Sequence, residues 1–82
     1  MNLIKNYFIR KKIKAELMVL VSENIDLKNK KLAELKKTDL DSIDMMNLLQ
    51  VIEKKWGKLN LADLYQAQDF DDIVILIQKN QS

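Results

Sequence analysis

The sequence contains no cysteine and no histidine among its 82 residues. The absence of cysteine excludes disulfides, thiolate nucleophiles and cysteine-based metal sites. Without histidine, a Ser-His or Cys-His nucleophilic pair cannot be assembled, and a zinc site would have to consist of carboxylates alone, which is uncommon. These absences argue against a hydrolase or a transition-metal enzyme. We therefore expect a non-catalytic protein without a metal site.

Turn-forming residues are almost as scarce, because the chain has no proline and Gly57 is its single glycine. Hairpin turns depend on residues that adopt a positive φ at low cost, so a β-rich fold is disfavoured. Hydrophobic residues make up 48% of the chain and charged residues 32%, a balance typical of a folded domain. We predict an all-α fold that forms one small domain over residues 1–82.

Long apolar runs are also lacking, since runs such as residues 17–21 are far shorter than a membrane span. Polar and basic residues interrupt the N-terminal stretch, which does not resemble a signal peptide. We expect a cytoplasmic monomer without a membrane span. Residues 1–40 carry a net charge of +5 and residues 41–82 a net charge of −3. Because the lysines are scattered over several segments, we interpret them as solvated helix faces and expect no nucleic-acid binding.

Apolar residues at helical spacing predict a first helix within residues 2–21. Its inward stripe is expected to consist of Ile9, Ile13, Leu17 and Leu20, with charged residues between them. Residues 1–8 are expected either to extend this helix or to fray. The aromatic side chains of Tyr7 and Phe8 indicate that part of this stretch packs against the rest of the protein.

The stretch 22–41 is rich in polar residues and predicts a long surface loop with a short helical turn around residues 31–36. A short turn or helix is expected at residues 61–65, and a final helix beginning near Asp69. The final helix should bury Phe70, Ile73, Val74 and Ile77. We interpret its acidic start as a helix cap, because it lacks the glycine and the distal glutamate of a calcium-binding loop.

The helix predicted at residues 42–56 has clear signals at both ends. Asp41 is a favourable N-cap residue, and Asp44 places a negative charge in the first turn, where the helix dipole favours it. Gly57 follows as a stop signal. The inward stripe of this helix is predicted to be Met45, Leu48, Leu49, Ile52 and Trp56.

If Asp41 is the cap, Ser42 is the first helical residue and its hydroxyl faces solvent. A phosphodiester at this position would lie at the positive end of the helix dipole, beside unpaired backbone N–H groups. The serine is not suited to act as a nucleophile itself, because the chain offers no base to activate it. Judged from this helix alone, a plain helix-start serine is the simpler interpretation.

The segment Asp41-Ser42-Ile43-Asp44 and the helix that follows, ending in Trp56-Gly57, resemble the Asp-Ser-Leu segment and second helix of acyl and peptidyl carrier proteins. The order of predicted elements resembles that family over most of the chain. The resemblance implies a four-helix bundle of the acyl-carrier-protein type, with three main helices and one short helix.

In that family the serine carries 4′-phosphopantetheine, which a phosphopantetheinyl transferase transfers from coenzyme A. The resemblance therefore implies that Ser42 is the attachment site and that the arm carries acyl or aminoacyl groups as thioesters. The partners would be a loading enzyme and downstream synthases. The resemblance does not distinguish among fatty-acid, polyketide, nonribosomal-peptide and D-alanyl carrier pathways.

The resemblance also implies a docking surface for partner enzymes on the same helix. Ile43 and Met46 match positions where the family exposes apolar side chains. Four further residues match positions that are often acidic and that dock basic patches on partners: Asp41, Asp44, Asn47 and Glu53. The alternative from another class is an unmodified helical adaptor, and replacement of Ser42 would distinguish the two.

Overall fold

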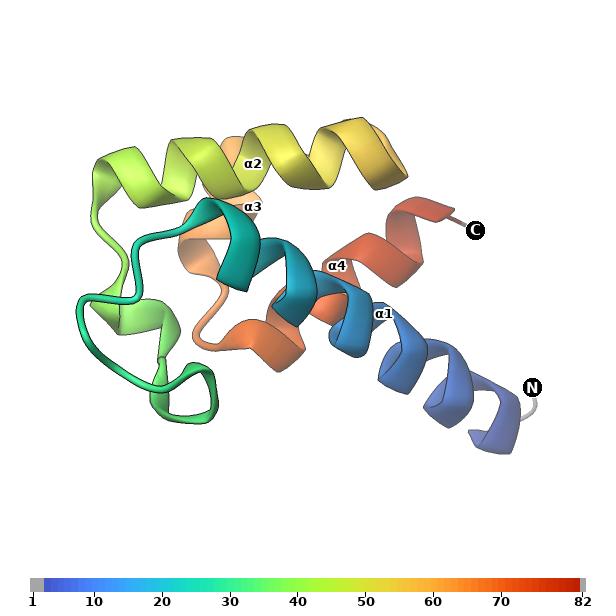
Figure 1. Ribbon diagram of the computed structural model, residues 1–82. Helices are drawn as coiled ribbons and strands as arrows, with labels where there is room; N and C mark the ends of the chain where they lie inside the picture. Colours follow the sequence, from blue (N-terminus) through green and yellow to red (C-terminus); the bar gives the residue numbers. More distant parts are fainter. Residues whose placement is uncertain (1–2, 82) are drawn as a thin grey trace.

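Four α-helices form a bundle in the computed structural model, which describes residues 3–81 (Figure 1). Their bounds are α1 (Leu3–Asn24), α2 (Ser42–Trp56), α3 (Leu61–Gln66) and α4 (Phe70–Gln81). Three helices are long, α3 is short, and residues 3–81 contain no strand. The prediction of an all-α bundle of three main helices and one short helix is confirmed. No helix in the described part of the chain is long and apolar enough to cross a membrane.

The buried side of α1 consists of Ile13, Leu17 and Val21. The predicted stripe was therefore right at its centre and wrong at its ends, because Ile9 is exposed and Leu20 is only half-buried. Each step of four residues shifts the position around a helix by about 40°. The buried residues Ile13, Leu17 and Val21 are each four apart, so the buried side turns slowly around the helix axis. The helix ends three residues later than predicted.

The first turns of α1 project beyond the other helices (Figure 1). The helix begins at Leu3, so the described part of the 1–8 stretch extends α1; residues 1 and 2 lie outside the described residues. The expectation that Tyr7 and Phe8 pack was wrong, because they are 59% and 61% exposed.

Polar side chains connect α1 and α4 at the level of these two aromatic residues. Gln78 of α4 accepts a hydrogen bond from Arg10 Nε at 2.6 Å and donates one to Asn6 Oδ1 at 3.3 Å. The aromatic side chains stay largely exposed, and Tyr7 borders an open hollow whose wall includes Val74 and Ile75 of α4. This arrangement explains why the apolar core includes α1 only from Ile13 onward.

The connection between α1 and α2 contains two short 3₁₀ helices, η1 (Leu32–Glu34) and η2 (Lys37–Asp39). The first confirms the helical turn predicted around residues 31–36, and the second was not anticipated. Ile25 and Leu35 are buried in the core. These two side chains fasten the long connection to the bundle.

Both ends of α2 are fixed as predicted. The Asp41 carboxylate accepts a hydrogen bond from the Asp44 N–H at 2.8 Å, and the Asp44 carboxylate accepts one from the Asp41 N–H at 3.1 Å, forming a reciprocal capping box. At the other end Gly57 has a φ of 96°, and its N–H donates to the Glu53 carbonyl at 3.0 Å. The predicted inward stripe packs in or against the core: Met45, Leu48, Leu49, Ile52 and Trp56.

Side-chain caps also begin α3 and α4. The Asn60 side-chain oxygen accepts a hydrogen bond from the Ala62 N–H at 2.8 Å. Before α4, Asp69 accepts from the Asp72 N–H at 2.9 Å, and Asp72 accepts from the Gln68 N–H at 3.0 Å. The acidic start of α4 is thus a helix cap, as predicted. This helix buries the four expected residues, Phe70, Ile73, Val74 and Ile77.

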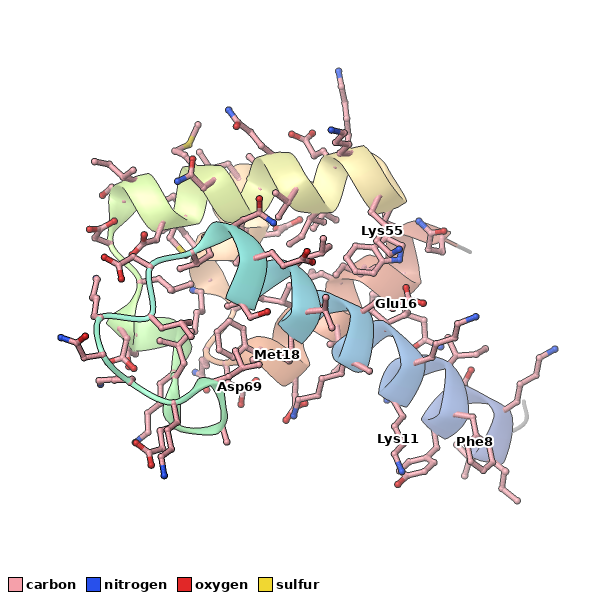
Figure 2. All side chains as sticks on the ribbon, viewed as in Figure 1. Phe8, Lys11, Glu16, Met18, Lys55 and Asp69 are labelled. Carbon is pink, nitrogen blue, oxygen red and sulfur yellow. The ribbon has the colours of Figure 1, made fainter. Side chains whose placement is uncertain are left out.

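The core lies where the three long helices meet. Leu17 of α1, Leu48 of α2 and Ile73 of α4 have no exposed surface. Burial of each such side chain contributes about 1.5–3 kcal/mol. Surface ion pairs add little to this apolar contribution; one joins Lys55 of α2 to Glu16 of α1 at 3.6 Å (Figure 2).

Candidate functional site

Ser42 is exposed and occupies the first position of α2, as the sequence predicted. The Asp41–Asp44 capping box fixes where the helix starts and therefore where the serine lies. Backbone N–H groups in the first turn of a helix lack intrahelical partners and carry partial positive charge. A negatively charged group attached to Ser42 would be stabilised there.

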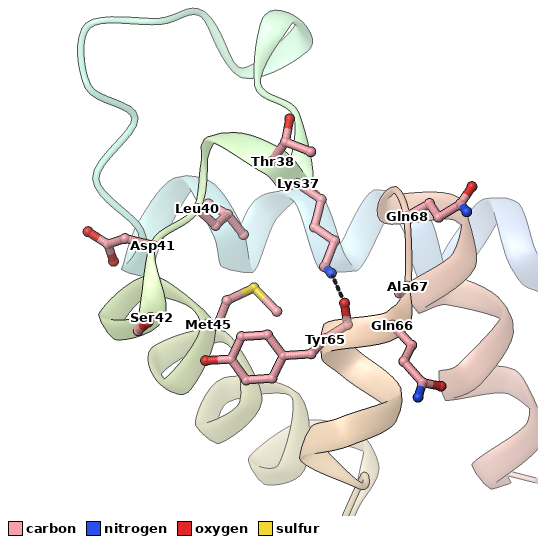
Figure 3. A pocket seen from close by; sticks show the side chains of 10 residues that line it. All are labelled: Lys37, Thr38, Leu40, Asp41, Ser42, Met45, Tyr65, Gln66, Ala67 and Gln68. Atoms are coloured by element: carbon pink, nitrogen blue, oxygen red, sulfur yellow. Dashed lines mark hydrogen bonds between the residues drawn. The ribbon is translucent and has the colours of Figure 1, made fainter.

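An open pocket of about 540 Å³ lies beside Ser42 (Figure 3). Residues from η2, the start of α2 and the end of α3 line it: Lys37, Thr38, Leu40, Asp41, Ser42, Met45, Tyr65, Gln66, Ala67 and Gln68. Lys37 Nζ donates a hydrogen bond to the Tyr65 carbonyl at 2.8 Å and so joins η2 to the end of α3. The pocket is therefore formed by two stretches that are distant in the sequence, residues 37–45 and residues 65–68.

Four of the six predicted docking residues lie on the outward side of α2. Ile43 is 72% exposed, and Met46 and Asn47 are exposed as well. Glu53 is half-buried, seven residues and therefore about two turns beyond Met46. Met46 and Asn47 follow Ile43 by three and four residues, and Glu53 follows Met46 by seven, so the four residues lie towards one side of the helix. Ile43 and Met46 are exposed apolar residues of α2 near Ser42, and Tyr65, exposed at the end of α3, lines the pocket beside the serine.

The remaining two predicted docking residues, Asp41 and Asp44, differ from each other. Asp41 is exposed at the helix start. Asp44 is only 7% exposed, and its carboxylate accepts the Asp41 N–H and lies 3.3 Å from Lys28 Nζ. We had expected Asp44 on the docking surface, but its burial corrects that assignment. It stabilises the start of α2 because a carboxylate in the third helical position completes the capping box.

Hydrogen bonds and lysines hold the acidic groups before α2 in their charged form. The pKa of Asp39 is lowered, first by a hydrogen bond from Lys30 and then by the Lys36 N–H. The pKa of Asp41 is lowered as well, mainly because its carboxylate accepts the Asp44 N–H. Both carboxylates are therefore negatively charged near neutral pH.

Sequence reasoning missed the contribution of Tyr65 and Lys37 to this site. Tyr65 was recognised only as the end of a short helix, and Lys37 as part of the long connection. Figure 3 shows the Tyr65 side chain beside Met45 and near Ser42. No local pattern in the sequence specifies that the end of α3 packs next to the start of α2. Only the tertiary arrangement brings these residues together.

Comparison with protein-family models, with curated proteins and with solved structures gives no match. Among residues 3–81, no group of three or more acidic side chains is placed to hold a metal ion.

Proposed function

We propose that the protein is a carrier that bears a 4′-phosphopantetheine arm on Ser42, supplied from coenzyme A by a phosphopantetheinyl transferase. One observation carries the proposal: an exposed serine is the first residue of a capped helix, beside an open pocket and an exposed apolar surface. The arm, when attached, would supply a thiol that holds acyl or aminoacyl groups as thioesters.

The residues around Ser42 fit such an arm. The N-terminal turn of α2 favours the phosphate, and Lys37 supplies a basic side chain among the residues that line the pocket. Leu40, Met45 and Ala67 give the same pocket an apolar lining that can accommodate the uncharged part of the arm. Ser42 needs no activating base within this chain, because the transferase would remove its proton. The serine oxygen would then form a bond to the phosphorus of the pantetheine phosphate, and the pyrophosphate bond of coenzyme A would break to release adenosine 3′,5′-bisphosphate.

The exposed surface beside Ser42 supports transient contact with partner enzymes. Ile43 and Met46 present apolar side chains, and Asp41 adds a negative charge at the edge. A surface this small favours weak association with rapid exchange, which a carrier requires in order to pass between enzymes. A flexible arm would raise the effective concentration of its cargo in each partner's active site. The cargo would then be acyl for fatty-acid or polyketide synthesis, or aminoacyl for nonribosomal-peptide or D-alanyl transfer.

The test is the intact mass of the purified protein after incubation with coenzyme A and a promiscuous phosphopantetheinyl transferase. We expect the wild type and Ser22→Ala to gain one phosphopantetheine each and Ser42→Ala to gain none. Helical circular dichroism of all three proteins controls for folding. A folded, initially unmodified wild type that gains no mass would contradict the proposal and favour an unmodified helical adaptor that uses the same surface.

A further inference from the structure

The projecting start of α1 exposes a continuous apolar face far from Ser42. Leu3 and Ile4 are 75% and 68% exposed, and Tyr7 and Phe8 follow one turn later. Residues three and four apart lie on the same side of a helix, so these four side chains form one face. The rings of Tyr7 and Phe8 touch edge to face, with centroids 5.5 Å apart. No other helix covers this face, which leaves large aliphatic and aromatic groups in water.

The same turns carry a strong positive charge. Glu16 is the first acidic residue of the chain, and five basic residues precede it: Lys5, Arg10, Lys11, Lys12 and Lys14. Lys11 Nζ lies 5.9 Å from the centre of the Tyr7 ring. Phe8 and Lys11 both extend from the projecting end of α1, away from α2 (Figure 2). Cationic groups thus border the apolar face directly.

A second pocket, of about 380 Å³, continues this surface towards α4. Its rim contains Tyr7, Arg10, Lys11 and Lys14, and its wall includes Val74 and Ile75. Lys14 Nζ is held 2.7 Å from the Asp71 carboxylate, and Arg10 donates to Gln78. The hollow therefore combines a positively charged rim with an apolar wall.

We propose that this face, defined by Leu3, Ile4, Tyr7 and Phe8, binds the surface of an anionic lipid bilayer. Aliphatic and aromatic side chains on one side of a helix, bordered by lysine and arginine, are typical of helices that lie in the membrane interface without spanning it. Anionic headgroups attract the cations while the apolar side chains leave water.

Other occupants fit the observations less well. Nucleic acid would engage the basic side chains but would leave Leu3 and Ile4 in water. A second copy of the chain would cover the apolar face but would bring two strongly positive segments together. The lipid surface satisfies both the apolar and the charged groups.

The proposal does not rest on the carrier function. The start of α1 and the start of α2 lie towards opposite ends of the molecule (Figure 1), whose longest dimension is 40 Å. A protein bound to lipid through α1 would therefore keep Ser42 accessible to soluble partners.

The experiment measures co-sedimentation of the full chain with vesicles of phosphatidylcholine alone and of phosphatidylcholine with phosphatidylglycerol. We expect binding only to the anionic vesicles, and weaker binding at high salt. Phe8→Gln should reduce this binding at least about tenfold, because the ring leaves water on binding. Lys11→Gln with Lys12→Gln should reduce it by roughly fivefold for each charge removed, corresponding to about 1 kcal/mol each.

Matched control variants test whether vesicle binding depends on this face or on any exposed apolar or basic residue of the protein. Val19→Gln changes an exposed apolar residue further along α1, and Lys54→Gln with Lys58→Gln removes the same charge elsewhere. Both control variants should bind like the wild type, and so should Ser42→Ala. Equal losses in the test and control variants would overturn the proposal.

Three further results would also overturn it. One is the absence of binding to anionic vesicles by a folded wild type. Another is that the wild type binds a short DNA duplex, measured by fluorescence anisotropy, instead of anionic vesicles, and that Phe8→Gln leaves the DNA binding unchanged. The third is a dimer in light scattering that Phe8→Gln dissociates while vesicles bind neither form. Because Ser42→Ala is tested separately with the transferase, a failure of the lipid-binding proposal leaves the carrier proposal unaffected.

Discussion

Lys28 Nζ lies 3.3 Å from the Asp44 carboxylate and so links the long connection to the first turn of the helix that carries Ser42. The same ammonium group donates to the Asp39 carbonyl at 2.9 Å. Lys28 and Asn29 have φ values of 55° and 68°, a conformation that L residues adopt at some cost. The ion pair places a positive charge beside a carboxylate that is largely buried.

Replacement of Lys28 by Met should therefore lower the free energy of unfolding by up to about 1 kcal/mol, since the pair is partly exposed. The measurement is the urea midpoint followed by helical circular dichroism. Lys58→Met, at an exposed position after α2, is the matched control and should leave the midpoint nearly unchanged. Equal shifts in the two variants would show that the Lys28–Asp44 pair does not stabilise the fold.

The N-cap of α2 gives a second prediction. Asp41→Ala should cost about 1 kcal/mol of stability, because the Asp44 N–H loses the carboxylate that accepts its hydrogen bond. Asp41→Asn should keep most of that stability, because its side-chain oxygen accepts the same bond. Urea unfolding of both variants measures the difference, and indistinguishable midpoints for Ala and Asn would refute the capping role.

The acidic groups before α2 predict a loss of stability at low pH. The folded pKa values of Asp39 and Asp41 lie below those of the unfolded chain, so their stabilisation is complete above the unfolded value of about 3.9. It is lost as the pH falls through the lowered folded values. The urea midpoint should therefore decrease below about pH 4.

A pair of variants tests which interaction causes this decrease. Lys30 Nζ lies 2.8 Å from the Asp39 carboxylate. Asp39→Asn and Lys30→Met should each make the decrease shallower, and the double variant should differ little from Asp39→Asn alone. An unchanged pH profile in Asp39→Asn would exclude this carboxylate as a contributor.

The core and the surface of α2 should respond very differently to truncation. Leu48→Ala removes a side chain without exposed surface and should cost about 2–5 kcal/mol. Ile43→Ala removes one that is 72% exposed and should change stability by less than about 0.5 kcal/mol. Thermal unfolding checks both values, and similar losses would mean that Ile43 packs in solution.

The element that the sequence predicted best is α2, because both of its ends carry local signals. Asp41 and Gly57 mark its bounds by hydrogen-bonding chemistry that needs no tertiary information. The inward stripe was predictable for the same reason, since helical spacing is a local property.

The start of α1 and the pocket beside Ser42 could not be predicted in this way. Tyr7 and Phe8 have the apolar character of core residues, but the tertiary packing leaves them 59% and 61% exposed. Likewise, the proximity of Tyr65 to Ser42 depends on how α3 packs against α2. The burial of Asp44 depends on Lys28, sixteen positions earlier, which no periodicity in the chain connects to it.

If the transferase contacts the surface around Ser42, changes to that surface should alter the rate at which the arm is attached. Ile43→Asp replaces an exposed apolar side chain with a charge and should slow transfer by about tenfold or more, because apolar contacts at the centre of an interface dominate affinity. Val19→Asp changes an exposed apolar residue on α1 and should leave the rate unchanged. Initial rates of mass gain measure both. Equal rates for wild type and Ile43→Asp would exclude Ile43 from the transferase contact.

The packing of α1 against α4 has a consequence for synthesis of the protein. Leu17 lies in the first helix of the bundle, whereas Ile73 and Ile77, fully buried in the same core, lie in the last. The N-terminus of a chain leaves the ribosome first, so the core is incomplete until α4 has left the exit tunnel. Stable folding is therefore expected only after nearly the whole bundle has been synthesised. Until then the apolar side of α1 lacks its main partner and is open to chaperones.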